Sequence, residues 1–371
     1  MSSPFAAIGL PLVATQLVGS WCKPHWLCDH ALVYGKEGTW WRIPEQQRPE
    51  ALDDSVRLAI DDQQRAGLSL ITDGEQRRQT FSGHFYSWGG IDQEEPGEVT
   101  NFASDVMEYL TMKARPAVAA AAPGAVPVKP RFEQPRIVGP LTWSRPLLGD
   151  EIRFAKRAAT SPLKVTIIGP CTMALRLVDE HYGSLRKVAF ALADVIAAEA
   201  KALVALGADV IQIDEPEVHF RYSQVSDFAV EAIDRALAGL TVATIVHVCY
   251  GYSKNIAEKR ATPVYASALE LLAATRTNAI SLEYEQPGYE PDLLQHTGDK
   301  TVVLGVLNLD TEAPVEQVQH IERRARDALQ MIGPERLQLG PDCGMWFLPR
   351  DTATAKITAM EAAARAIRAS L

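Results

Sequence analysis

Eight short runs of β-favouring residues, many followed by long segments rich in alanine and leucine, constrain the fold of this 371-residue chain more than any other feature. The runs cover residues 15–19, 68–72, 165–168, 210–213, 244–248, 279–282, 302–306 and 337–339. Strands that alternate with helices build parallel sheets, and eight such strands close into a barrel. We therefore predict an α/β protein with a (β/α)8 TIM-barrel fold and a single domain over residues 1–371; an open doubly wound sheet is the alternative.

Two segments depart from this alternation. Residues 22–44 are rich in tryptophan and have no periodic pattern, which predicts a long loop after the first strand, folded over the mouth of the barrel. Residues 114–130 are rich in alanine and proline and predict a surface excursion, and residues 137–138 predict an extra strand that leads back. The sequence thus predicts an inserted excursion near residues 90–150.

Composition restricts the class of function. The formal net charge is -9 and no basic stretch is available to neutralise phosphates, which argues against a nucleic-acid partner. No run of eighteen apolar residues occurs, and no lysine or arginine precedes Lys23, so we expect neither a membrane span nor a secretory signal. The five cysteines have irregular spacings that do not predict a disulfide framework. We expect a soluble, cytoplasmic protein.

Polar or reactive residues follow six of the predicted strands. They are VGS at residues 18–20, TDGE at 72–75, IDEP at 213–216, HVC at 247–249, LEY at 282–284 and PDCG at 341–344. In a parallel barrel the carboxyl ends of all strands lie on one face, where active sites are built. We therefore expect residues that are far apart in the sequence to converge there.

Four of these strand-end residues could bind a metal. His247 and Cys249 are two positions apart in a predicted strand, so their side chains point the same way. With Glu283 and Cys343 they form a mixed set of nitrogen, sulfur and oxygen ligands, which is typical of zinc. A single buried cysteine is more often a small apolar residue. The residues alone therefore leave zinc ligands and structural thiols both open.

The order and spacing of several motifs carry a family resemblance. The runs VGSW, DGEQRR, IIGPCTM, IQIDEP, HVCYG, ISLEY and PDCG, between about residues 15 and 368, resemble the catalytic domain of cobalamin-independent methionine synthase and its relatives. The resemblance implies a (β/α)8 barrel that transfers a methyl group to the thiol of homocysteine. It also implies a zinc ion held by His247, Cys249, Glu283 and Cys343.

The resemblance implies roles for the remaining strand-end residues. Zinc would activate the homocysteine thiol as a thiolate, with Glu283 as a ligand that the substrate sulfur displaces. Asp214 and Glu75 would bind the amino group of homocysteine, whereas Ser20 and the Gly19 backbone would contact its carboxylate. Asp214 also fits the cap of a following helix, so both roles remain open.

Departures from the family pattern leave the donor open. The two-domain enzymes are about twice as long and carry a tryptophan after GPxT that helps to hold folate, whereas this chain has GPCTMALRL. This difference points away from folate and towards a methylcorrinoid protein or another alkyl donor.

The sequence is also compatible with two other functions. HVCYG, LEYEQP and LGVLN also resemble epoxyalkane:coenzyme M transferases, whose sulfonate-bearing thiol would need a cation such as Arg77 or Arg78. A non-catalytic zinc barrel that docks a corrinoid protein is the third reading. Cys22, His25, Cys28 and His30 could form a second metal site, but their spacing matches no common zinc motif and favours the mouth-covering loop.

Overall fold

Seven of the eight predicted strands form one parallel sheet in the computed structural model, which describes residues 3–29, 41–99, 132–250, 259, 262 and 264–371. The strand order is β1-β10-β9-β8-β7-β6-β4. The strands are β1 (Ala14–Thr15), β4 (Lys164–Ile168), β6 (Val210–Asp214), β7 (Ala243–Val248), β8 (Ala279–Leu282), β9 (Thr301–Gly305) and β10 (Leu337–Gly340). Six of them match the predicted runs to within one residue at each end; β1 ends earlier than predicted.

The eighth run closes the barrel through single bridges. Leu70 forms a parallel bridge with Gln16, and Ile71 forms one with Leu163, so residues 70–71 join β1 to β4. The run is short because the buried side chain of Gln63 bonds to both backbone groups of Thr72, at 2.9 Å each, in place of a neighbouring strand. The predicted α/β TIM-barrel class is confirmed.

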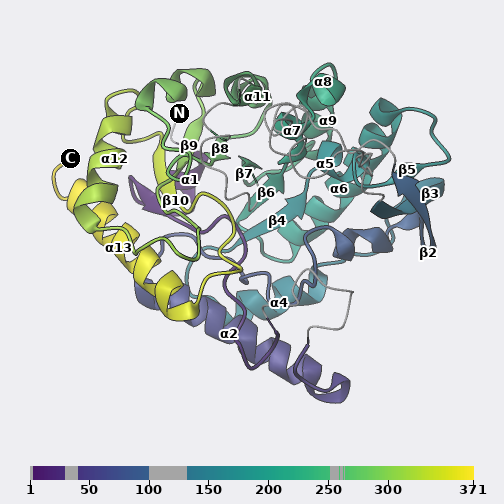
Figure 1. The fold of residues 1–371 in the computed structure, drawn as a ribbon, viewed down its shortest axis with the longest axis horizontal. Helices are drawn as coiled ribbons and strands as arrows, with labels where there is room; N and C mark the ends of the chain where they lie inside the picture. The colour runs from purple at the N-terminus through teal and green to yellow at the C-terminus, as the bar shows by residue number, and fades with distance from the viewer. Residues whose placement is uncertain (1–2, 30–40, 100–131, 251–258, 260–261, 263) are drawn as a thin grey trace, which may run out of the picture.

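Helices surround the strands, as Figure 1 shows. The longer ones are α2 (Arg48–Ala66), α4 (Gly149–Ala158), α6 (Leu185–Ala205), α9 (Ala229–Ala236), α11 (Val264–Ala273), α12 (Val318–Leu329) and α13 (Arg350–Arg368). The short ones are α1 (Pro4–Ala7), η2 (Glu45–Gln47), η3 (Gly83–Ser87), α5 (Pro170–Ala174), α7 (Glu217–Phe220), α8 (Tyr222–Val225) and η4 (Pro291–Thr297). Each long helix buries one apolar face, as α2 does with Val56, Ala59 and Ile60. Among the described residues, no helix is long and apolar enough to cross a membrane.

A polar layer fills part of the barrel interior. The ammonium of Lys164, on β4, donates to Gln16 Oε1 at 2.6 Å, to Gln212 Oε1 at 2.7 Å and to the Leu17 carbonyl. Burial lowers the pKa of Lys164 to about 7. Gln212 and Lys164 each lie two positions before a residue of the candidate active site. Residues two apart in a strand point to the same side, so this polar layer lies directly beneath that site.

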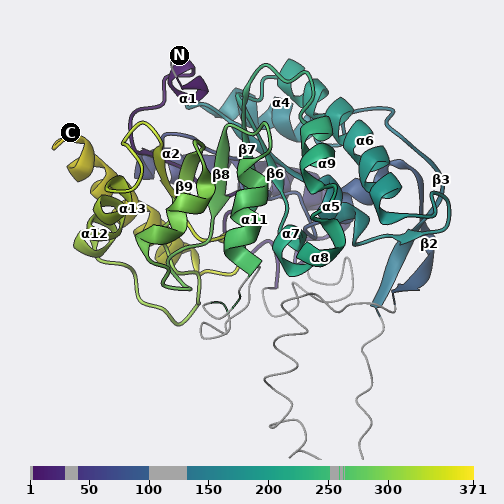
Figure 2. The ribbon, with the colours of Figure 1, turned by 90° about the horizontal axis from the view of Figure 1, so that it is seen from above.

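The insertion predicted near residues 90–150 contributes two strands to a separate small sheet. Strands β2 (Gly89–Val99) and β3 (Phe132–Thr142) pair antiparallel, and β3 pairs parallel with β5 (Val178–Asp179). The extra strand predicted at residues 137–138 is confirmed as part of β3. Figure 2 shows this sheet at the opposite end of the molecule from α12 and α13. The excursion predicted at residues 114–130 lies outside the described residues.

Candidate active site

A cavity of about 420 Å³ opens where the strands end. Its wall combines Gly19 and Ser20, which follow β1, with Asp214 at the end of β6. His247 and Cys249 from the end of β7 and Cys343 from the loop after β10 complete one side. The structure thus brings together residues that the sequence placed at separate strand ends, as the geometry of a parallel barrel requires.

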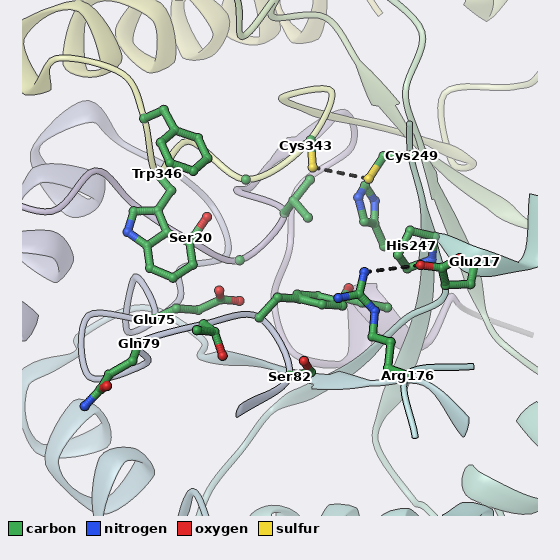
Figure 3. Close-up of a pocket in the computed structure, with 18 of the residues that line it drawn as sticks. Ser20, Glu75, Gln79, Ser82, Arg176, Glu217, His247, Cys249, Cys343 and Trp346 are labelled. Atoms are coloured by element: carbon green, nitrogen blue, oxygen red, sulfur yellow. Dashed lines mark hydrogen bonds and ion pairs between the residues drawn. The ribbon is translucent and has the colours of Figure 1, made fainter. Parts of the chain in front are cut away.

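Three metal-ligating side chains meet on this wall. The ligand atoms of His247, Cys249 and Cys343 all lie within 4.8 Å of one another. The two sulfur atoms are 3.2 Å apart and point toward each other above the imidazole of His247, as Figure 3 shows. Neither cysteine is in a disulfide. In the described part of the chain, no other group of three or more His, Cys, Asp and Glu side chains could hold a metal ion.

The imidazole of His247 indicates that a ligand belongs at this site. Its Nδ1 lies 3.0 Å from Ser281 Oγ on the neighbouring strand β8, whereas its Nε2 is buried and has no hydrogen-bond partner. Buried polar atoms are rarely left unpaired without a reason. Burial lowers the pKa of His247 to about 3, which keeps the ring neutral, the form that binds metals. One imidazole and two thiols at this separation fit zinc.

Glu283, the fourth predicted ligand, is not part of this cluster. Its carboxylate is buried, forms an ion pair with Lys259 and accepts the Tyr250 N–H at 2.8 Å. Lys259 is itself buried and donates also to Gln286 Oε1. Tyr250 follows Cys249 directly, so Glu283 lies beside the cluster and has another partner.

Glu75 occupies the cavity wall next to Gly19. Glu75 Oε1 accepts the Thr166 hydroxyl at 2.6 Å and lies 3.2 Å from Arg78 Nη1. A Cβ on Gly19 would lie 2.2 Å from Glu75 Oε1 and 2.9 Å from Thr166 Cγ2, so a larger residue here would displace this carboxylate. Glu75 also has a positive φ of 53°, and Asp73 Oδ1 accepts its N–H at 3.0 Å. The TDGE turn is therefore shaped to present Glu75 to the cavity.

Asp214 faces the same cavity. Its Oδ1 accepts Gln212 Nε2 at 2.7 Å. Burial raises the pKa of Asp214 to about 7, and the nearby Glu75 carboxylate adds to the effect. Two largely buried carboxylates at the wall of one cavity are stabilised best by a cation between them. This pair is thus suited to an ammonium group.

The two predicted arginines point in different directions. Arg78 is buried behind the acidic pair, and its guanidinium binds Glu75 and the Thr166 carbonyl, the latter at 2.7 Å. Arg77 forms an ion pair with Asp53 instead. Neither arginine lines the cavity between Ser20 and Cys343.

Asp342 holds two parts of the site together, a role that the sequence analysis did not assign. Its carboxylate accepts the backbone N–H groups of Tyr284, Glu285 and Gln286 at 3.0, 2.9 and 2.6 Å. Asp342 directly precedes Cys343, so these bonds hold the segment that follows Glu283 next to the loop that carries Cys343. Asp342 is part of the PDCG motif, but the sequence does not show that its carboxylate binds three backbone N–H groups. Lys259 had no sequence signal.

The segment 22–29 packs at the mouth of the barrel. Lys23 donates to the Glu75 carbonyl at 2.9 Å and lies 4.9 Å from the ring centre of Trp346, which also lines the cavity. Burial raises the pKa of Cys22 to about 12 and that of Cys28 to about 11, so both thiols are protonated. His30, the last residue of the alternative metal site, lies outside the described residues.

Comparisons with known proteins agree with this geometry. Residues 13–366 match the family model described as the catalytic domain of cobalamin-independent synthase. A methionine synthase from Sulfurisphaera tokodaii is 30% identical over 98% of this chain and 94% of its own length. One from Saccharolobus solfataricus is 29% identical over 98% and 97%. The solved structure of a B12-independent methionine synthase from Shewanella sp. W3-18-1, in complex with selenomethionine, has a TM-score of 0.81 and 27% identity, over 97% of this chain and 99% of that one.

Proposed function

Because the chain belongs to the family of cobalamin-independent synthase catalytic domains, we propose that it is a zinc-dependent methyltransferase that converts homocysteine to methionine. One observation carries the proposal: a buried, unpartnered imidazole nitrogen of His247 faces two close thiols, those of Cys249 and Cys343, beside an acidic pair. Homocysteine has both groups that this arrangement suits, a thiol and an ammonium.

The sulfur end of the substrate belongs near His247, Cys249 and Cys343, which would hold zinc. When bound there, zinc supplies the positive charge that keeps a substrate thiol deprotonated at neutral pH. In the overall reaction the sulfur lone pair forms a bond to the methyl carbon, the bond from that carbon to the donor breaks, and the donor keeps its electron pair. The thiol proton is released to solvent.

The amino-acid end of the substrate belongs near Glu75 and Asp214. An ammonium between these carboxylates would favour the charged form of Asp214, whose pKa burial has raised to about 7. Ser20 and Gly19 line the same cavity, and the Ser20 side chain and the Gly19 backbone would contact the substrate carboxylate. These contacts orient the sulfur toward the cysteine pair.

Glu283 is proposed as an exchangeable ligand. Its carboxylate lies beside the cysteine pair and is bound to Lys259 and to the Tyr250 N–H. When the substrate sulfur is bound, Lys259 gives Glu283 another partner. The buried carboxylate of Glu283 is therefore paired both with and without substrate. Catalytic zinc sites commonly keep one such open position.

Lys259→Met tests this assignment. Without its ammonium partner, Glu283 is free to bind the metal, and we expect zinc affinity in the absence of homocysteine to rise by about ten-fold. Homocysteine affinity should fall, because the substrate must then displace a stronger ligand. Competition with a chelator measures the first value and calorimetry the second. Lys156→Met, at an exposed ion pair with Asp209, is the control. Weaker zinc binding in Lys259→Met would contradict the assignment.

A coenzyme M acceptor has less support. A sulfonate needs a cation, but Arg78 is bound to Glu75 and Thr166, and Arg77 does not line the cavity. Arg176 does line the cavity, but its guanidinium forms an ion pair with Glu217. A non-catalytic docking role is also less well supported, because none of the relatives described above is named as a docking protein.

The decisive experiment incubates zinc-loaded protein with homocysteine or coenzyme M and each of three donors: methyltetrahydrofolate, methylcobalamin and a short epoxide. Mass spectrometry of the products identifies both substrates. We expect methionine. Formation of an alkylated coenzyme M and no methionine would overturn the proposed acceptor.

A further inference from the structure

A second cavity, of about 300 Å³, adjoins the one that contains the cysteine pair. The two cavities share Gln79 and Thr80 in their walls. Figure 3 shows the side chain of Gln79 at the edge of the site, directed away from the cysteine pair. A molecule longer than homocysteine could therefore occupy both cavities at once and pass between them at these two residues.

The second cavity is lined by basic side chains. Arg77, His84 and Arg145 contribute to its wall, together with hydroxyl and amide side chains such as Ser87, and its described lining contains no carboxylate. The first cavity contains three carboxylates, those of Glu75, Asp214 and Glu217. The two cavities thus suit groups of opposite charge.

Acidic residues behind the wall orient two of these basic groups. Arg77 forms an ion pair with Asp53, and its guanidinium lies 5.2 Å from the ring centre of Phe154. The Nε of Arg77 is buried without a hydrogen-bond partner. His84 Nε2 lies 3.0 Å from Glu151 Oε1. These contacts hold both side chains in place at the wall.

Arg145 is different from the other two. It is exposed and forms no ion pair with any described residue. A guanidinium presents planar pairs of N–H donors that match a carboxylate or a phosphate. An unpaired arginine beside an oriented arginine and an imidazole is the arrangement that recognises an oxyanion.

We propose that this second cavity binds an anionic end group, a carboxylate or a phosphate, of the methyl donor. The proposal rests on the proposed methyl transfer, because it assigns the donor to the cavity that homocysteine leaves free. The donor is then an extended molecule, with its methyl group near Cys343 and its oxyanion near Arg145. Homocysteine needs no such contact, because its carboxylate and ammonium are bound near Ser20 and Glu75.

Direct binding of small probes tests the proposal without any methyl transfer. Zinc-loaded protein is titrated by calorimetry at low ionic strength with glutarate, with inorganic phosphate and with the neutral diamide glutaramide. We expect one site for glutarate or for phosphate, with the tighter probe indicating which oxyanion the donor carries, and no binding of glutaramide. Saturating homocysteine should leave the anion affinity unchanged, because the sites are separate.

Variants locate the probe. Arg145→Gln should weaken anion binding by about ten-fold, since it removes one charge-assisted contact from an exposed side chain with no structural partner. Arg186→Gln, at an exposed ion pair with Glu231, is the control and should bind normally. Arg176→Gln, in the first cavity, should also bind normally. Equal affinity in Arg145→Gln, or loss of binding only in Arg176→Gln, would overturn the proposal. Anion binding without methionine formation would instead refute the proposed function alone.

Discussion

Replacement of Cys249 and Cys343 by serine in one variant is expected to reduce bound zinc to near zero and methionine formation to about a hundredth or less. The two sulfur atoms are 3.2 Å apart and share a wall with the unpartnered Nε2 of His247. Serine keeps the size of the side chain but does not ionise to a soft ligand. Without zinc, a substrate thiol remains largely protonated at neutral pH.

The fold should survive this double substitution. The barrel has an extensive apolar core, so it does not depend on a metal ion for its stability. Elemental analysis measures zinc, and circular dichroism during heating measures the fold. Cys28→Ser is the matched control, because that buried thiol lies outside the cluster and should leave zinc content unchanged. Full zinc content in the double variant would show that the ligands lie elsewhere.

Asp214→Asn is expected to weaken homocysteine binding by about ten- to a hundred-fold. The substitution keeps the shape of the side chain but removes its negative charge. An ammonium in this buried site would then face Glu75 alone, and the new amide would have to accept Gln212 through its oxygen. Calorimetry measures the affinity of the parent protein and of Asp214→Asn for homocysteine. Both titrations are made at one pH above 7, because the pKa of Asp214 is about 7 and its carboxylate is charged above that pH.

The same variant distinguishes the acceptor thiols. A sulfonate is repelled by Asp214, so coenzyme M should bind Asp214→Asn equally well or more tightly. Asp194→Asn, at an exposed ion pair with Arg235, is the control for a simple loss of charge. If Asp214→Asn bound homocysteine more tightly than the parent protein, the acidic pair could not be the ammonium site.

The strands were predictable because parallel barrel strands are buried on both faces and therefore appear as short apolar runs. Every residue of β4, β6 and β7 is buried, for example. The run at residues 68–72 was the least accurate, because a glutamine from α2 replaces a strand partner there. A side chain that imitates a backbone partner leaves no periodic signal.

The candidate site was predictable where it lay at strand ends. His247, Cys249 and Cys343 are brought together because the barrel places those ends on one face. The partner of Glu283 was not predictable, because the contact between Lys259 and Glu283 is determined by tertiary packing. The different partners of Arg77 and Arg78 likewise follow from irregular structure after TDGE. Periodicity predicts side-chain direction only within regular elements.

Only two single bridges close the barrel, and they lie beside the proposed homocysteine site. Gln16 and Leu70 pair on one side of residues 70–71, and Ile71 pairs on the other, so thermal opening of the barrel should begin between β1 and β4. Gly19 and Glu75, which contact each other across the same join, are both proposed to touch homocysteine. If homocysteine binds there as proposed, it would link the two sides of the barrel wall at its least paired position. On the proposed function, substrate affinity and the rigidity of the barrel wall would then depend on the same few contacts.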